Sequence, residues 1–367
     1  MKTNCYKLLP LTLIAITLGA CTSNSADKVE PDDAFNAIEK ASKKTSESEK
    51  TTIKTVDDPL YAQMGVEIKN DNKWNYVTAK VEHLPLDITY SGYDKNDASK
   101  LKASIVSKGS GEDAPGATIK LNTDITFGDT DISGMIPRID DLAIASYVKD
   151  GTYYVDYSDS SLSLLVNLVK VALNQIDSVE VTLPKNKKAK ASLDEEGLDK
   201  VNELIGQFNI DTNILKDLYN DVPSLFAFNK DKITIKATTK EEFKSYLEAA
   251  YDLGSQEASR EEQSSLSEAK EDIFASYDKY MEYASFSSFE TSIGFNENGL
   301  SSVSSSLNIS SFDHDGLVKA FPEETTLPYG KFSYQGEFEF SYDKEPSFPS
   351  DLDQYGEIVV TKKDTTI

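Results

Sequence analysis

Cysteine, histidine and tryptophan are nearly absent from this sequence, which contains two, two and one of them, respectively. A Ser-His-Asp triad needs a histidine base, and neither histidine is accompanied by a Gly-x-Ser-x-Gly nucleophile elbow. His83 precedes a strand-like run, and His314 lies in the turn-like stretch FDHDG. We therefore expect two surface histidines and a protein that is not an enzyme.

Positive charge is also scarce. The chain has 38 lysines and arginines against 62 aspartates and glutamates, which gives a formal net charge of −24. This balance argues against a nucleic-acid partner, because binding to a phosphate backbone needs clustered positive charge. It also argues against a polybasic attachment to anionic lipid head groups.

The N-terminal residues have the layout of a secretory signal. Lys2 and Lys7 precede the largely apolar run Leu8–Leu18, which is too short for a membrane span of about 20 residues. The run ends in LGAC, which resembles the lipobox of bacterial lipoproteins and implies cleavage before Cys21 and lipid attachment to its thiol. Two acyl chains give stable anchoring, so we expect the protein on the extracytoplasmic face of a membrane, as on a Gram-positive surface. Because Cys5 would be removed and the other thiol lipidated, we expect no disulfide, zinc thiolate site or cysteine nucleophile.

We divide the chain into four parts by composition and periodicity. Residues 1–20 are the signal peptide, and the polar residues 21–32 form a lipidated, flexible tether. Residues 33–350 form one domain, with a central helical segment at about 160–283. Residues 351–367 are a C-terminal strand or tail.

The first half of the domain has the period of β-strands. From Tyr61 to Tyr157, apolar residues alternate with polar ones, as in Ala62, Met64, Val66 and Ile68. Turn residues separate the runs, and Lys149-Asp150-Gly151 predicts a hairpin. Period two with short turns predicts successive antiparallel strands, each with one covered face.

The central segment has the period of helices. In SSLSLLVNLVKVALNQ the polar residues fall on one stripe, which predicts a helix that is buried or that covers an apolar cavity. Capping boxes predict two further helix starts, at Ser192 with Glu195 and at Thr239 with Glu242. We expect Gly254 to interrupt the second of these helices.

Strands return near the C-terminus. The pair Asn298-Gly299 is a strong hairpin signal, and KFSYQGEFEFSY places its aromatic residues on one face. The order of helix, many strands, helices and a few strands predicts an α+β fold. We expect a large curved antiparallel sheet with the helices packed on its concave face.

This pattern resembles the bacterial lipoprotein and lipid carriers related to LolA, LppX and LprG. The shared features are the lipobox at Cys21, an early short helix, consecutive strands including VKDGTYYVDYS, a central helical segment and a closing strand pair. The resemblance implies a half-barrel sheet whose concave face holds an acyl chain or a lipoprotein lipid. The glutamate-rich segment from Thr239 to Tyr283 departs from the pattern and indicates a helical extension beyond a minimal half-barrel.

One stretch has the spacing of a calcium loop. In DTDISGMIPRID the candidate ligands are Asp129, Asp131, Ser133 and Asp140, and calcium takes oxygen ligands from a tightly turned backbone. Pro137, an aspartate in place of the usual final glutamate and the lack of flanking helices favour a solvated turn. We expect no other metal or cofactor.

These patterns lead to a hypothesis for function. We expect a non-enzymatic lipoprotein that binds a lipid or a lipoprotein acyl chain in a pocket between sheet and helices. The candidate lining residues are Leu162, Leu165, Val166, Val169 and Leu173 in the aliphatic stretch, and Phe332, Tyr334, Phe338 and Phe340 in the aromatic one. A filled core uses the same residue types, so core packing stays open as their role. The alternative is a cell-surface interaction module whose acidic helices bind another envelope protein, and a third hypothesis is a calcium-assisted carbohydrate binder.

Overall fold

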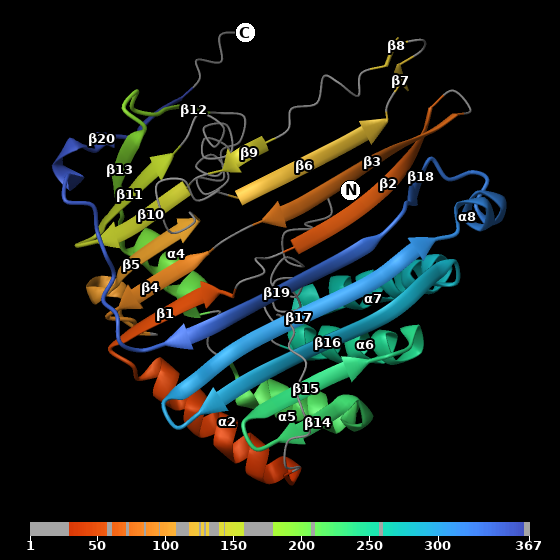
Figure 1. The fold of residues 1–367 in the computed structure, drawn as a ribbon, viewed down its shortest axis with the longest axis horizontal. Coiled ribbons are helices and arrows are strands. Elements are labelled where there is room, and N and C mark those ends of the chain that lie inside the picture. Colours follow the sequence, from red (N-terminus) through yellow and green to blue (C-terminus); the bar gives the residue numbers. More distant parts are fainter. Residues whose placement is uncertain are drawn as a thin grey trace.

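The computed structural model describes residues 29–56, 61–70, 73–83, 86–94, 96–107, 117–124, 126–127, 130–131, 139–142, 144–157, 179–206, 210–256 and 260–362. One large, open and mostly antiparallel sheet runs through these residues, and the longer helices lie on one of its faces (Figure 1). The α+β fold expected from the order of the elements is confirmed.

The described part of the chain contains six α-helices and a series of strands. The helices are α2 (Pro31–Ser46), α4 (Glu195–Gly206), α5 (Thr212–Asp221), α6 (Lys240–Gln256), α7 (Arg260–Met281) and α8 (His314–Ala320). The strands of the first half are β1 (Lys50–Thr55), β2 (Tyr61–Asn70), β3 (Lys73–His83), β4 (Asp87–Ser91), β5 (Lys102–Ser107), β6 (Ala117–Asp124), β7 (Thr126–Phe127), β8 (Thr130–Asp131), β9 (Ile139–Leu142), β10 (Ile144–Lys149) and β11 (Thr152–Tyr157). The remaining strands are β12 (Val179–Thr182), β13 (Lys188–Ser192), β14 (Phe226–Asn229), β15 (Lys232–Ala237), β16 (Ala284–Asn296), β17 (Gly299–Phe312), β18 (Thr326–Pro328), β19 (Phe332–Ser341), β20 (Gly356–Glu357) and β21 (Val359–Lys362). No helix among these described residues is long and apolar enough to cross a membrane.

The strands from β1 to β10, apart from the separate pair β7–β8, form a meander in which each long strand is divided in two. β1 pairs with β4 while β2, the next strand along the chain, pairs with β3. In the same way β5 pairs with β4 and β10, and β6 pairs with β3 and β9. The sheet therefore has a β1 half (β1, β4, β5, β10) and a β2 half (β2, β3, β6, β9), which lie end to end in Figure 1.

Strand β19 joins both halves to the C-terminal part of the sheet. One of its edges pairs with β17 along most of its length, and its other edge pairs first with β2 and then with β1. Gly336 lies between these two pairings and is buried, so no side chain occupies the junction. The N–H of Val56 donates to the carbonyl of Glu337 beside it, at 3.0 Å. The alternation of aromatic and polar residues predicted for this strand is confirmed.

The helices form the second layer and enclose two cores. The larger core packs α2, α5 and α6 against β14 to β17, with Ile38 and Phe289 fully buried within it. The ring of Phe289 lies 4.9 Å from Phe243 and 4.6 Å from Tyr246 of α6, measured between centroids. The second core lies beneath α4, where Ile205 packs with Ile53 of β1. Each side chain of this size contributes about 1.5–3 kcal/mol when fully buried.

Local signals specify some element ends and miss others. The capping box at α6 is confirmed, because Thr239 Oγ1 accepts from the N–H of Glu242 at 3.1 Å and Glu242 Oε2 accepts from the N–H of Thr239 at 3.2 Å. The box predicted at Ser192 is wrong, because this residue ends β13; instead, Asp194 Oδ1 accepts from the N–H of Gly197 at 2.9 Å. The predicted interruption at Gly254 is also wrong, because α6 continues to Gln256. A glycine inside a helix lowers the stability of the helix by only about 1 kcal/mol relative to alanine. The favourable contacts of neighbouring residues can offset this loss, so the helix continues past Gly254.

Candidate functional site

One face of β2 carries apolar side chains that stay exposed to solvent. Met64, Val66 and Ile68 share this face by alternation, and they are 52%, 37% and 40% exposed. The β2–β3 register places Val77 opposite Val66, which extends the apolar surface onto β3. Isolated apolar residues are common on protein surfaces, but a contiguous row indicates a binding or docking surface.

Val66 also forms one wall of an apolar groove of about 500 Å³. Helix α7 forms the opposite wall, and the ends of β17 and β18 lie between them. The lining residues are Val66, Ile273, Ser276, Tyr277, Tyr280, Met281, Phe312, Thr326, Leu327 and Pro328. This volume lies within the usual range of small-molecule pockets, and an apolar lining with few polar groups is typical of them.

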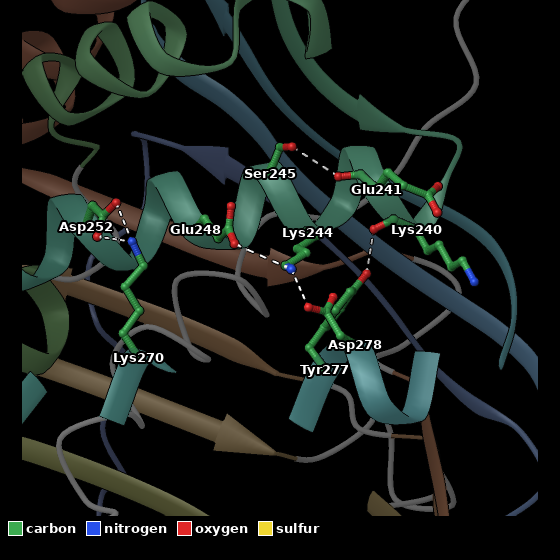
Figure 2. A network of polar contacts seen from close by, with 9 residues as sticks. All are labelled: Lys240, Glu241, Lys244, Ser245, Glu248, Asp252, Lys270, Tyr277 and Asp278. Carbon is green, nitrogen blue, oxygen red and sulfur yellow. Dashed lines mark hydrogen bonds and ion pairs between the residues drawn. The ribbon is translucent and has the colours of Figure 1, made fainter. Parts of the chain in front are cut away.

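Two polar groups at the α7 wall, the Tyr277 hydroxyl and the Met281 carbonyl, have hydrogen-bond partners. The hydroxyl of Tyr277 donates to the carbonyl of Lys240 at 2.7 Å (Figure 2), and burial raises the pKa of this phenol above its ordinary value. The ammonium group of Lys240 donates to the carbonyl of Met281 at 3.2 Å. Tyr277 therefore lines the groove with the apolar part of its ring, and the positive charge of Lys240 is engaged by a carbonyl.

Ion pairs between α6 and α7 fix the position of the α7 wall. Figure 2 shows Lys244 of α6 between Glu248 on its own helix and Asp278 on α7. The Lys244–Asp278 pair is 2.6 Å long, and Lys270 of α7 reaches Asp252 of α6 at the same distance. Both lysine side chains are about 30% exposed, so each pair contributes less than about 1 kcal/mol. They link the two helices at two points and neutralise part of the acidic surface.

The opposite face of β2 carries a buried acid–imidazole pair. Glu67 is 6% exposed, and its carboxylate contacts Nδ1 of His314, the first residue of α8. The contact is favourable only when one of the two atoms carries a proton, because both are otherwise acceptors. Burial raises the pKa of the Glu67 carboxyl, and the neighbouring imidazole opposes this rise. Trp74, the single tryptophan of the chain, packs edge-on against the His314 ring at 5.9 Å between centroids.

The side chain of His314 is 38% exposed, in line with the expectation of a surface histidine, and its Nδ1 contacts Glu67. Sequence reasoning missed the pair because Glu67 stands on the polar side of an alternating strand, where a glutamate is ordinarily solvated. Only the return of α8 to β2 buries it. His83 ends β3, and its side chain lies outside the described part of the structure.

The aromatic residues predicted to line a pocket lie within the two cores. Phe332 and Tyr334 pack against the larger core, while Phe338 is buried in the second core and Phe340 contacts both. Tyr334 shares a 2.9 Å hydrogen bond with the hydroxyl of Ser305, and burial raises its pKa to about 12. The apolar groove is formed instead by β2, α7 and β18, which sequence reasoning did not single out.

Several predicted site residues lie outside the described residues. They are Cys21, the aliphatic residues Leu162, Leu165, Val166, Val169 and Leu173, and the calcium candidates Asp129 and Ser133. The other two calcium candidates lie in separate strands, Asp131 in β8 and Asp140 in β9. Within the described ranges, no three histidine, cysteine, aspartate or glutamate side chains come together as a metal site. The calcium loop stays a prediction.

A second, polar cleft of about 770 Å³ lies between the end of α2, the residues after β4, and the helices α4 and α5. Serines and acids dominate its lining, including Ser42, Glu47, Glu49, Asp94 and Asp211. Such a lining favours water over an apolar ligand, which distinguishes it from the groove at β2.

The chain matches no protein-family model, no curated protein and no solved structure. The resemblance to the lipid carriers therefore stays a prediction.

Proposed function

We propose that this protein is a membrane-anchored extracytoplasmic lipoprotein that binds an apolar ligand, a lipid or a lipoprotein acyl chain, in the groove between α7 and β2. The exposed row of Met64, Val66 and Ile68 beside the groove carries the proposal. An acyl chain that covers this row removes apolar surface from water. Each Å² of apolar surface buried in this way contributes roughly 25 cal/mol to the binding free energy. The lipobox-like LGAC supplies the anchoring part of the proposal.

The charges around the groove favour an uncharged ligand chain. Lys279, on α7, pairs with Glu324 at 2.6 Å. The ammonium of Lys69 on β2 lies over the ring of Trp74 and donates to the carbonyl of Pro322 at 3.4 Å. With these lysines engaged and a formal net charge of −24, the groove is suited to hold an aliphatic chain rather than to capture a phosphate.

The test is binding of cis-parinaric acid, a fluorescent fatty acid, to the full chain and two variants. In Val66→Glu, a carboxylate stands in the groove wall, and burying it beneath an apolar chain is costly. We expect this change to weaken binding at least tenfold. Leu204→Glu is the matched control, because Leu204 is a similarly exposed apolar residue on α4, away from the groove.

Failure of the wild-type chain to bind the probe would overturn the proposal. Equal affinity in Val66→Glu and Leu204→Glu would also overturn it, because binding would then not depend on the groove. Organic extraction of the purified protein gives an independent measurement, in which a stoichiometric lipid supports the proposal.

A further inference from the structure

The segment from Asp313 to Thr325, here called the strap, connects one side of the groove to another. It leaves β17 after Phe312, forms α8 and enters β18 at Thr326. Both flanking residues line the groove. A movement of the strap would therefore move the groove lining directly.

The strap is attached to the β2 wall at three points. His314 at its start contacts the buried carboxylate of Glu67. Near its end, the carbonyl of Pro322 accepts from the Lys69 ammonium at 3.4 Å, and the carbonyl of Thr325 accepts from the Lys69 N–H at 2.8 Å.

The same strap is attached to the α7 wall. Its Glu324 accepts from Lys279 at 2.6 Å, and the Lys279 ammonium also lies 4.4 Å above the ring of Phe321. The Phe321 ring stands edge-on to Tyr280 and Tyr283, at 5.9 Å from each. Tyr280 is itself a lining residue of the groove.

We propose that the strap ties the β2 wall to the α7 wall and sets the width of the groove, so that its release is the conformational step that admits or frees an apolar ligand. The gating part rests on the proposed function, whereas the tie itself rests on the strap contacts. One wall belongs to the sheet and the other to the helical layer, and the strap is bonded to both. Glu67 is the one carboxylate among the described residues that is buried, and it is placed where the strap meets β2.

The strap is held by contacts of two kinds: Leu317 of α8 is fully buried and Glu67 is 6% exposed, whereas the Lys279–Glu324 pair is partly exposed, and exposed contacts open more readily than a packed core. Lys279 and Glu324 are 29% and 43% exposed as side chains. The strap also contains a short helix of seven residues, α8, which cannot be stable alone. Release of the strap therefore begins at its exposed anchors and is complete only when Leu317 leaves its buried position.

The test compares the wild-type full chain with Glu67→Gln/Lys279→Met, which weakens one anchor on each wall while it preserves side-chain size. Asp315→Asn is the matched control, because it removes an exposed acid from α8 without touching either anchor. Amide hydrogen exchange is measured by mass spectrometry, and the rates of cis-parinaric acid binding and release are measured by stopped flow. Emission from Trp74 reports locally on the His314 contact, since the chain has no other tryptophan.

In the double variant we expect amides of residues 314–325 to exchange at least tenfold faster, while the amides of β16 and β17 up to residue 309 stay as protected as in wild type. We expect probe release to be at least threefold faster, and we expect Asp315→Asn to match wild type in both measurements. Unchanged exchange in the strap would overturn the tie. Faster strap exchange with unchanged probe rates would overturn the gating role.

A variant that exchanges faster everywhere has lost stability as a whole; Glu67→Gln alone, with its Trp74 emission, then decides whether the strap moves. If the wild-type chain binds no probe, the proposed function and the gating role both fail. Exchange in the strap still decides the tie in that case.

Discussion

Thr45, at the end of α2, closes a ring of three hydrogen bonds with the start of β17. Its Oγ1 accepts from the N–H of Leu300 at 3.0 Å, its hydroxyl is 2.6 Å from that of Tyr342, and the Tyr342 hydroxyl donates to the carbonyl of Leu300 at 2.8 Å. Thr45 is 2% exposed, and burial raises the pKa of Tyr342 to about 12. The ring joins the first helix to the C-terminal hairpin.

Replacing Thr45 by valine should therefore destabilise the protein by about 1–3 kcal/mol. Valine preserves the shape of the side chain but leaves the buried N–H of Leu300 without an acceptor, and such a group costs that amount. The measurement is urea unfolding, followed by circular dichroism. Thr45→Ser is the control, because serine retains the hydroxyl; a valine variant no less stable than the serine variant would contradict the prediction.

A second prediction at the residue scale concerns the pH dependence of stability. Burial holds the pKa of Glu67 above its ordinary value of about 4.5, so the folded chain binds a proton here that the unfolded chain has already released. The free energy of unfolding must then fall as pH rises from about 4.5 through the folded pKa. Glu67→Gln cannot titrate and should lack this contribution.

Unfolding free energies of both proteins, measured from pH 4 to 8, give by difference the contribution of Glu67 together with its contact to His314. The groups on the elements around the pair are Lys69 on β2, Lys73 and Tyr76 on β3, Asp313, Asp315 and Lys319 at α8, and Glu323, Glu324 and Tyr329 beyond it. These groups are present in both proteins, so their contributions to the pH dependence of unfolding largely cancel in the difference. Parallel curves for wild type and Glu67→Gln would refute the predicted contribution.

At the scale of elements, the start of α6 allows a direct test of a sequence motif. Thr239 and Glu242 satisfy each other's backbone N–H groups, and Glu242 also accepts from the N–H of Thr238 at 2.7 Å. Thr239→Ala should cost about 1 kcal/mol, the usual value of a helix N-cap. Thermal unfolding checks this value, with Thr239→Ser as a control that should stay within a few tenths of a kcal/mol of wild type; an equal loss in both variants would contradict the capping role.

Features that depend on neighbours in sequence were predictable, and features that depend on distant contacts were not. The alternation from Tyr61 onward predicted the strands, and Asp150-Gly151 predicted a hairpin that the structure confirms, with φ values of 50° and 73°. The sequence did not predict that the long strands divide into two halves, because the division is defined by which strand pairs with which. It also could not separate Met64, which is exposed, from Phe338, which is buried, since both are apolar residues of alternating strands.

The same limit applies to the candidate site. The aromatic strand β19 has the strongest apolar pattern, and its residues fill the cores. The groove draws single residues from β2, α7, β17 and β18, and no short stretch carries a signal for it. Glu67 and His314 meet only because β17 returns the chain to the far end of β2, so their pairing depends on topology alone.

At the scale of the whole molecule, charge and anchoring are linked. A chain with a formal net charge of −24 is repelled by a membrane surface of anionic lipids. A groove that binds lipid near such a surface therefore requires an attachment that does not depend on charge. Each buried methylene of an acyl chain contributes about 0.8 kcal/mol, and two chains are enough to hold a protein on a membrane.

We therefore predict that lipidation at Cys21 determines where the protein is found. Expressed in a bacterial host, the wild-type chain should partition with membranes, and mass spectrometry should detect a diacylglyceryl group on an N-terminal Cys21. Cys21→Ser removes the thiol that accepts the lipid, so it should leave the membrane fraction or remain uncleaved. Cys5→Ser is the matched control, because Cys5 precedes the apolar run that ends at Cys21, and its replacement should not change the partition. Membrane association of Cys21→Ser equal to that of wild type, with no lipid mass on the wild-type protein, would mean that another part of the chain holds it there.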